Sequence, residues 1–307
     1  MRIVSLLPST TEIAFALGLG DQVVAVTHEC DFPAAARARP VITASALEHS
    51  DASSEAIDAA VRSQLRDGLS IYTLDSVLLE QLQPDLILTQ ALCDVCAVSF
   101  SSVEQAVAAT SVAPRILSLE PTTLDAIFGT ILAVGNATGR RERALELVAE
   151  LRARVERVQA RVAQAHYRPR VACLEWFDPP FGPGHWLPEL VELAGGRAGL
   201  GQAGEPSRRI SWGEVIAFAP EVIVLTPCGF DLERTAREAA AILPHRPGWT
   251  ALPAVRNGRV YAVDANSYMS RPGPRIVDSL ELLARLTHPE LCAGWGPAAG
   301  ARAVTLA

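Results

Sequence analysis

The chain has 307 residues, a formal net charge of −7 and 49% hydrophobic residues, and its 27 basic residues are all arginine because it contains no lysine. This length supports one large domain or two ordinary domains with full cores, and the composition excludes extended disorder. The negative charge without a basic stripe argues against nucleic acid or an anionic membrane as the main partner, and no stretch reaches the ~18 consecutive apolar residues of a membrane span.

The first 135 residues alternate short β-branched runs with longer helical patterns. Ser9 or Thr10 is expected to cap the first helix, which ends at Gly18, and Pro84 separates a later helix from a buried strand. The alternation predicts a parallel, doubly wound sheet. The expected strands cover residues 2–7, 22–27, 85–89 and 115–119, and the expected helices cover 10–17, 76–83, 103–110 and 122–136.

A long helix from about Gly139 to Ala165 interrupts this alternation. It carries arginines on one side and a leucine and valine stripe on the other, and at ~1.5 Å per residue it is roughly 40 Å long. A second series follows, with strands at 171–174, 222–225 and 260–263 and helices at 187–193, 212–218 and 276–286. The sequence therefore predicts an α/β fold of two Rossmann-like lobes with parallel sheets, joined by a single long backbone helix. The predicted parts are an N-terminal lobe (1–138), the linking helix (139–166) and a C-terminal lobe (167–307).

The two halves repeat one pattern. Pro84-Asp85 opens one strand and Pro220-Glu221 opens another, and a cysteine follows each strand. This weak duplication predicts two similar lobes. Open α/β sheets bind ligands at the carboxyl ends of their strands, so we expect a ligand cleft between the lobes.

The most unusual stretch of the chain covers residues 175–186. It places Trp176, Phe177, Phe181 and Trp186 among three prolines and two glycines, in a chain with only 6% aromatic residues. Such a stiff aromatic wall is typical of a site for a flat, partly apolar ligand. The alternative interpretation is a buried lid over the core of its own lobe. Further candidate walls of the same cleft are Trp212, Tyr268 and Arg271.

Four of the six cysteines lie just beyond the carboxyl end of an expected strand, namely Cys30, Cys93, Cys96 and Cys228. His28 together with Cys30, Cys93 and Cys96 forms a set of four ligands that suits a tetrahedral zinc ion. The alternatives are a thiol pair at a helix start and small buried hydrophobic side chains. We expect His185 first and His28 second to contact a ligand, although a lone histidine is more often a structural hydrogen-bonding residue.

Met1-Arg2 leads directly into an apolar strand, without the charged region, apolar core and cleavage site of a signal peptide. The expected location is therefore the cytoplasm. In that compartment the cysteines are expected to be reduced thiols or metal ligands rather than a disulfide framework.

The common catalytic motifs do not occur in the required context. No G-x-S-x-G elbow, P-loop or G-x-G-x-x-G follows a strand, and no H-E-x-x-H lies on a helix. The sequence therefore favours a binding protein over an enzyme.

Several motifs, spread over nearly the whole chain, resemble the cobalamin-binding branch of the substrate-binding proteins of ABC transporters. Members of that branch have two Rossmann-like lobes joined by one helix, move little on binding and hold a corrinoid between the lobes. Relatives bind siderophores or haem on the same fold. The motifs are residues 2–13, the exit Val26-Thr27 toward Asp31-Phe32-Pro33, residues 84–87, the long central helix, Pro179-Pro180-Phe181, Ser211-Trp212 and residues 271–275.

The resemblance implies that the Pro-Pro-Phe loop contacts the ligand, and that Ser9, Thr10 and main-chain groups bond to the amide-rich rim of a corrinoid. A thiolate or an imidazole of the cleft is a further candidate ligand of cobalt. The candidate ligand contacts are Pro8, Ser9, Thr10, His28, Cys30, Cys93, Trp176, Phe177, Asp178, Pro180, Phe181, His185, Trp186, Trp212, Cys228, Tyr268 and Arg271.

The resemblance also carries one departure. Transporter-bound members have one surface glutamate per lobe that docks on arginines of the transporter. Val77 and Gly213 stand at these positions, with Glu80 and Glu214 nearby but shifted. An uncharged residue cannot form that ion pair, which makes transporter docking doubtful. The hypothesis is a cytoplasmic corrinoid-binding protein for storage, delivery or sensing. The alternatives are a siderophore- or haem-binding protein of the same fold and a zinc-dependent enzyme that uses cleft cysteines and histidines.

Overall fold

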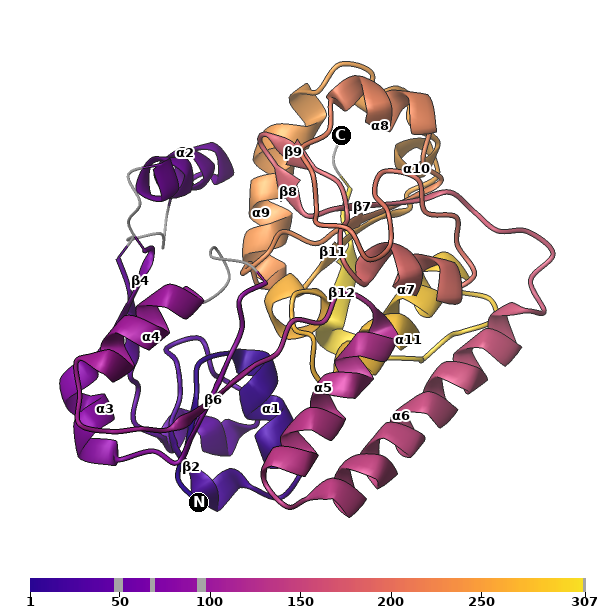
Figure 1. The fold of residues 1–307 in the computed structure, drawn as a ribbon. Helices are drawn as coiled ribbons and strands as arrows, with labels where there is room; N and C mark the ends of the chain where they lie inside the picture. The colour runs from indigo at the N-terminus through magenta and orange to yellow at the C-terminus, as the bar shows by residue number, and fades with distance from the viewer. Residues whose placement is uncertain (47–51, 67–69, 93–97, 306–307) are drawn as a thin grey trace. The chain divides into compact units, whose positions relative to one another are not determined.

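The computed structural model describes residues 1–46, 52–66, 70–92 and 98–305 (Figure 1). The chain forms two compact units. Unit 1 comprises Met1–Ala52, Ala56–Pro121 and Ala126–Val148, and unit 2 comprises Ser53–Glu55, Thr122–Asp125 and Ala149–Ala307. None of the helices in the described ranges has the length and hydropathy needed to cross a membrane.

Unit 1 is built on a four-stranded parallel sheet with the order β2-β1-β5-β6. Its apolar, mostly β-branched strands are short and largely buried, as expected for a parallel sheet that is covered on both faces. The alternating strands and helices confirm the predicted α/β class. The strands are β1 (Ile3–Ser5), β2 (Val23–Ala25), β5 (Leu86–Thr89) and β6 (Arg115–Ser118).

The helices of this part of the chain are α1 (Pro8–Ala16), α2 (Ser54–Arg66), α3 (Ser76–Leu82), α4 (Phe100–Ala108) and α5 (Leu124–Ala137), with short 3-10 helices η1 (Gly20–Gln22) and η2 (Ala34–Ala38). The sequence did not predict α2, nor the antiparallel hairpin of β3 (Thr43–Ser45) and β4 (Tyr72–Leu74). Both hairpin strands are only three residues long and are largely open to solvent. Their residues therefore lack the alternation of apolar and polar side chains from which a strand is predicted.

The first helix begins earlier than the sequence predicted. Leu7 is the N-cap and Pro8 is the first helical residue, so neither Ser9 nor Thr10 caps the helix. Proline is favoured there because its missing N–H would have no helical acceptor. The side chain of Thr10 instead donates a hydrogen bond to the carbonyl of Leu7 (3.0 Å).

The predicted long helix is present as α6 (Arg141–Val162), slightly shorter than expected at both ends. At 1.5 Å per residue it measures about 33 Å. Within unit 2, the α6 residue Arg154 forms ion pairs with Asp278 (2.5 Å) and Glu281 (2.9 Å). These two carboxylates raise the pKa of Arg154 further above its usual range.

Unit 2 is built on a four-stranded sheet with the order β12-β11-β10-β7, of which only β12 is antiparallel. The core beside it contains Phe177, Trp249 and the inner strand residues. The predicted strand bounds match the structure for β7 (Val171–Leu174), β10 (Val222–Leu225) and β11 (Val260–Val263), whereas the edge strand β12 (Ala301–Ala303) was not predicted.

The remaining elements of unit 2 are mainly helical. They are β8 (Trp176–Phe177), β9 (Pro180–Phe181), α7 (Leu187–Leu193), α8 (Trp212–Phe218), α9 (Leu232–Ile242), η3 (Leu243–His245), η4 (Trp249–Ala251), α10 (Pro253–Arg256), the π-helical turn η5 (Ala265–Met269), α11 (Ile276–Thr287) and η6 (Ala298–Gly300).

Each unit contains the same junction between a helix and a buried strand. In unit 1 Asp85 follows α3 and its carboxylate accepts the main-chain N–H of Arg2 (2.7 Å). In unit 2 Glu221 follows α8 and accepts the main-chain N–H of Arg170 (3.0 Å). The two acids therefore tie the residue before β1 or β7 to the amino end of its neighbouring strand. The repeat predicted from Pro-Asp and Pro-Glu is a repeat of hydrogen bonds as well as of sequence.

Candidate functional site

The loops that follow the carboxyl ends of β1 and β2 form the candidate edge of unit 1. Beneath this edge, three buried hydroxyls are hydrogen-bonded to one another. Ser5 Oγ lies 2.7 Å from Thr10 Oγ1 and accepts a hydrogen bond from Thr11 Oγ1 (2.8 Å). Ser9 and Thr10 are both buried. The contact between Thr10 and a ligand stays a prediction, and in this structure the Thr10 hydroxyl holds α1 against β1.

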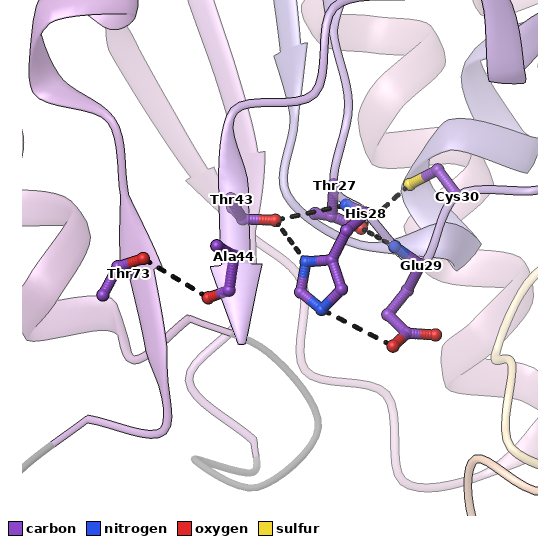
Figure 2. A network of polar contacts seen from close by, with 7 residues as sticks. All are labelled: Thr27, His28, Glu29, Cys30, Thr43, Ala44 and Thr73. Carbon is purple, nitrogen blue, oxygen red and sulfur yellow. Dashed lines mark hydrogen bonds and ion pairs between the residues drawn. The ribbon is translucent and has the colours of Figure 1, made fainter. Parts of the chain in front are cut away.

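Cys30 continues this network. Its Sγ atom lies 3.2 Å from Thr27 Oγ1 (Figure 2). It also lies 3.1 Å from Thr11 Oγ1, and the residue is 5% exposed. The sulfur thus sits between two hydroxyls under the loop. Its expected role as an exposed ligand contact does not fit this burial.

His28 projects from the same loop and is held at both ring nitrogens. Nδ1 lies 2.9 Å from Thr43 Oγ1, which also accepts the main-chain N–H of His28 (3.3 Å), and Nε2 lies 3.5 Å from Glu29 Oε1 (Figure 2). The geometry is satisfied when Thr43 donates its proton to Nδ1 and Nε2 carries the ring proton toward the carboxylate. The ring centroid of His28 is 5.6 Å from that of Tyr72. His28 is therefore a positioned, partly exposed side chain.

The predicted zinc set is only partly visible. Cys93 and Cys96 lie outside the described residues, so the set as a whole stays a prediction. Within residues 1–46, 52–66, 70–92 and 98–305, no group of three or more His, Cys, Asp or Glu side chains could hold a metal ion.

Unit 1 also exposes an aromatic side chain, Phe32, that was not predicted as a ligand contact. Phe32 follows Cys30 by two residues and is 44% exposed, which is unusual for so large an apolar side chain. The motif Asp31-Phe32-Pro33 carried the signal, since an aromatic ring beside a proline in a loop at a strand end suits ligand contact.

In unit 2 the predicted aromatic wall folds as a hairpin. Strands β8 and β9 are antiparallel, with Trp176 opposite Phe181 and Phe177 opposite Pro180. Successive side chains of a strand point to opposite faces. Phe177 is accordingly fully buried in the core, whereas Trp176 and Phe181 lie together on the other face and are partly exposed.

Two of the four predicted wall residues are buried. Phe177 packs in the core of unit 2, and its ring is fully buried there. Trp186 is 8% exposed, and its indole N–H donates to the carbonyl of Met269 (3.0 Å). The alternative of a buried lid describes these two residues, while the ligand-facing interpretation stays open for Trp176 and Phe181.

A row of rings and a cation extends the exposed face of the hairpin. The ring centroids of Trp176 and Phe230 are 5.1 Å apart, and the guanidinium carbon of Arg234 lies 4.0 Å from the centroid of Phe230. Both distances suit aromatic and cation-π contacts. Phe230 and Arg234 were not predicted as site residues, because the loop after β10 drew attention only through Cys228. That cysteine is exposed, and its N–H donates to the carbonyl of Glu175 (3.3 Å).

His185 has an unusual main-chain and side-chain environment. Its φ is 50°, and its main chain is fixed by hydrogen bonds with Glu205 (2.6 Å) and Gly204 (2.9 Å). Its Nδ1 is buried and has no hydrogen-bond partner among the described residues. Burial lowers the pKa of the imidazole, which favours the uncharged form of the ring. The ring also stacks on Trp186 at 5.7 Å. A strained main chain that carries a buried imidazole is a feature of ligand sites.

The remaining predicted contacts of unit 2 have structural partners. Trp212 packs against the core residue Trp249 at 6.1 Å and donates its indole N–H to the carbonyl of Pro247 (2.8 Å), so it is not a free wall. Arg271 is 3% exposed, which also disfavours direct ligand contact. Tyr268 lies on η5 with the guanidinium of Arg275 5.4 Å from its ring.

The positions compared with docking glutamates lie on corresponding helices. Val77 on α3 is 66% exposed, and Gly213 lies exposed on α8. The nearby Glu80 accepts hydrogen bonds from the N–H and the hydroxyl of Ser111. Glu214 closes a capping box, and these hydrogen bonds together with Arg208 lower its pKa to about 2. Both acids are thus engaged by their own unit.

Residues 3–267 match the periplasmic binding protein family, and the chain belongs to it. The vitamin B12-binding protein of Vibrio cholerae serotype O1 is 26% identical over 284 residues, which cover 91% of this chain and 86% of that protein. An uncharacterized ABC transporter substrate-binding lipoprotein, YvrC of Bacillus subtilis, is 24% identical over 295 residues, covering 94% of this chain and 80% of that protein.

Solved structures share the fold. The periplasmic vitamin B12 binding protein BtuF of Vibrio cholerae has a TM-score of 0.66 at 24% identity, covering 94% of this chain and 96% of that chain. The periplasmic heme-binding protein RhuT from Roseiflexus sp. RS-1 has a TM-score of 0.67 at 24% identity, covering 94% and 98%. These matches confirm the predicted fold with two α/β lobes, and the family match places the chain among binding proteins, as the sequence predicted.

Proposed function

We propose that this protein binds cobalamin or a related corrinoid. The observation that carries the proposal is the match of 91% of the chain to proteins named as vitamin B12-binding proteins. The site chemistry supports it, because each unit offers partly exposed rings at its carboxyl edge: Phe32 in unit 1, and Trp176 with Phe181 in unit 2. Aromatic faces bury the apolar faces of a macrocycle, and a few polar groups then fix its orientation.

A haem or a siderophore is the second candidate ligand. It is supported by the heme-binding protein of equal structural similarity and by His185, whose neutral imidazole is a ligand type that iron accepts. The same imidazole is also a candidate ligand for cobalt. A zinc-dependent enzyme has less support, since the family is one of binding proteins and the described residues provide no cluster for a metal ion.

A titration with a ligand panel tests the proposal. Purified protein is titrated with cyanocobalamin, hemin and a ferric hydroxamate, and binding is followed by calorimetry and by the absorbance of each ligand. We expect one cyanocobalamin per chain with a Kd of micromolar or below, which corresponds to at least about 8 kcal/mol. Saturable uptake of hemin or of the hydroxamate, with no uptake of cyanocobalamin, would overturn the corrinoid proposal in favour of the second candidate.

Storage, delivery or sensing in the cytoplasm is a separate proposal. Its support is the content of six cysteines, which suits a reducing compartment, and the engagement of Glu80 and Glu214 within their own units. Fractionation of the native host with an antibody against the untagged protein tests it. Recovery in the soluble cytoplasmic fraction is expected, and recovery in an exported or membrane-anchored fraction would contradict it.

A further inference from the structure

The turn of the β8–β9 hairpin lacks its usual hydrogen bond. Phe177 and Pro180 are paired and flank the two-residue turn of Asp178 and Pro179. In such a hairpin the residue after the turn donates its N–H to the carbonyl of the residue before the turn. Pro180 has no N–H. The carbonyl of Phe177 has therefore lost its donor within the hairpin.

Arg246 supplies the missing donor. Its Nη2 atom donates to the carbonyl oxygen of Phe177 (2.9 Å) and lies 3.0 Å from Asp178 Oδ1. One nitrogen thus joins the main chain of β8 to the side chain of the turn. Asp178, a predicted ligand contact, is thus also one of the groups that hold the turn.

The arginine stands on a fixed support. Its main-chain N–H donates to the carbonyl of Leu243 (3.0 Å), and its carbonyl accepts the N–H of Trp249 (3.1 Å). Leu243 and Trp249 are both buried in the core of unit 2. Arg246 therefore connects the hairpin turn to the core rather than to another exposed loop. We call the two contacts of its Nη2 atom, with Phe177 and Asp178, the brace.

The second strand of the hairpin is held from its other side. Gly182 donates its N–H to the carbonyl of Arg208 (3.0 Å), and Ile210 donates to the carbonyl of Pro180 (2.9 Å). These bonds fix β9 but not the carbonyl of Phe177, for which Arg246 is the donor. Both supports hold the backbone that carries the cross-strand pair Trp176 and Phe181, and the indole N–H of Trp176 also donates to the carbonyl of Ser54 (3.0 Å).

We propose that Arg246 is a positioning residue of the ligand site. By replacing the turn hydrogen bond that Pro180 cannot make, it holds Trp176 and Phe181 as a preformed aromatic pair, and a preformed pair loses less conformational freedom on binding. This inference rests on the proposed function for its ligand, but the support of the hairpin by Arg246 is a property of the ligand-free protein.

Four variants test the inference. Arg246→Met removes the donor and keeps an apolar stem. Arg246→Lys retains one nitrogen that can donate to both acceptors, although its stem is one atom shorter. Asp178→Asn keeps one oxygen acceptor, replaces the other oxygen with an NH2 donor and removes the charge. Arg237→Met removes an exposed arginine of α9 in the same unit and is the matched control.

The first readout is amide hydrogen exchange of residues 174–182 in the ligand-free protein. We expect faster exchange in Arg246→Met, partial rescue in Arg246→Lys, a smaller effect in Asp178→Asn and none in Arg237→Met. Equal exchange in Arg246→Met and in the natural protein would overturn the inference, whatever ligand is bound. If Arg246→Met fails to fold by circular dichroism, the exchange rates of the other variants test the inference in its place. Exchange of residues 174–182 should then be fastest in Arg246→Lys, slower in Asp178→Asn and slowest in the control Arg237→Met, and equal rates in all three would overturn the inference.

The second readout is the binding of cyanocobalamin. We expect the dissociation rate of Arg246→Met to rise about tenfold while the association rate changes less than about twofold, since lost preorganisation acts mainly on residence time. An unchanged dissociation rate together with faster exchange would overturn the role in the ligand site. If the natural protein takes up no cyanocobalamin, the proposed function fails, and the exchange readout still supports or refutes the brace.

Discussion

Phe177 and Trp176 are neighbours in sequence on opposite faces of β8, which makes them a matched pair for mutation. The ring of Phe177 is fully buried beside Trp249, whereas the ring of Trp176 is partly exposed and packs on Phe230. Replacing a buried phenylalanine by alanine removes its burial and leaves a cavity, which costs about 3–5 kcal/mol. Replacing Trp176 by alanine loses its contact with Phe230, worth about 0.5–1.5 kcal/mol. It also loses the hydrogen bond from its indole N–H to the carbonyl of Ser54 (3.0 Å), worth about 0.5–1.5 kcal/mol more, which gives about 1–3 kcal/mol together.

The assay is unfolding by urea, followed by tryptophan fluorescence with Trp249 as a reporter in the same core. With a denaturant slope of about 2 kcal/mol/M, Phe177→Ala is expected to lower the midpoint by about 1.5–2.5 M and Trp176→Ala by about 0.5–1.5 M. The order reverses for binding. Trp176→Ala is expected to weaken cyanocobalamin binding about ten- to hundredfold, as for an aromatic anchor.

Two results would refute this reasoning. Equal midpoints for the two variants would show that Phe177 does not carry the packing of this core. Undiminished binding by a folded Trp176→Ala variant would show that the exposed face of the hairpin does not contact the ligand. Phe181→Ala, on the same face as Trp176, should follow Trp176→Ala in both measurements.

Three further predictions concern other parts of the chain. The pKa of Glu214 is lowered to about 2 in the folded protein. Its contribution to stability is therefore fully present above its unfolded pKa and is lost as the pH falls through about 2. The free energies of unfolding of Glu214→Gln and of the natural protein should differ at pH 5 and become equal near pH 2. Burial raises the pKa of the Cys173 thiol, so iodoacetamide at pH 8 should leave it unmodified until the protein unfolds, as read by mass spectrometry. A Cβ at Gly213 would lie 3.8 Å from Ser211 Oγ, an ordinary van der Waals contact, whereas one at Gly201 would lie 1.7 Å from the carbonyl oxygen of Pro183. Gly213→Ala should therefore stabilise the protein by about 0.5–1 kcal/mol, and Gly201→Ala should lower the Tm. An equal effect of both substitutions on the Tm would contradict this.

The strands of unit 2 show what the sequence determines well. β7, β10 and β11 were predicted to the residue, because each is a run of buried apolar residues between polar or turn-forming neighbours. The edge strand β12 is short and mostly exposed, so its residues carry no comparable pattern. The bounds of the central strands could thus be predicted from the sequence because these strands are buried on both faces.

The structural surroundings of the candidate site residues were harder to predict, for a physical reason. Composition alone identified the aromatic stretch, but the face of each ring depends on the pleat of a hairpin whose two prolines argue against a strand. Thr10 and Trp186 were chosen for their chemistry, and the structure uses that chemistry within the protein, for Leu7 and Met269. Which polar groups are already satisfied is decided by tertiary contacts that the sequence does not display.

The division of α5 and α6 between the units has a practical consequence for dissecting this protein. Unit 2 includes Thr122–Asp125, which precede α6 in the chain, and the main-chain N–H of Leu124 donates to Glu189 of α7 (2.8 Å). A fragment that starts within α6 would therefore leave that carboxylate without this donor. No single cut in the chain yields an intact unit 2, so an engineered split or a lobe exchange with a relative must carry Ser53–Glu55 and the first turn of α5 along with the C-terminal segment.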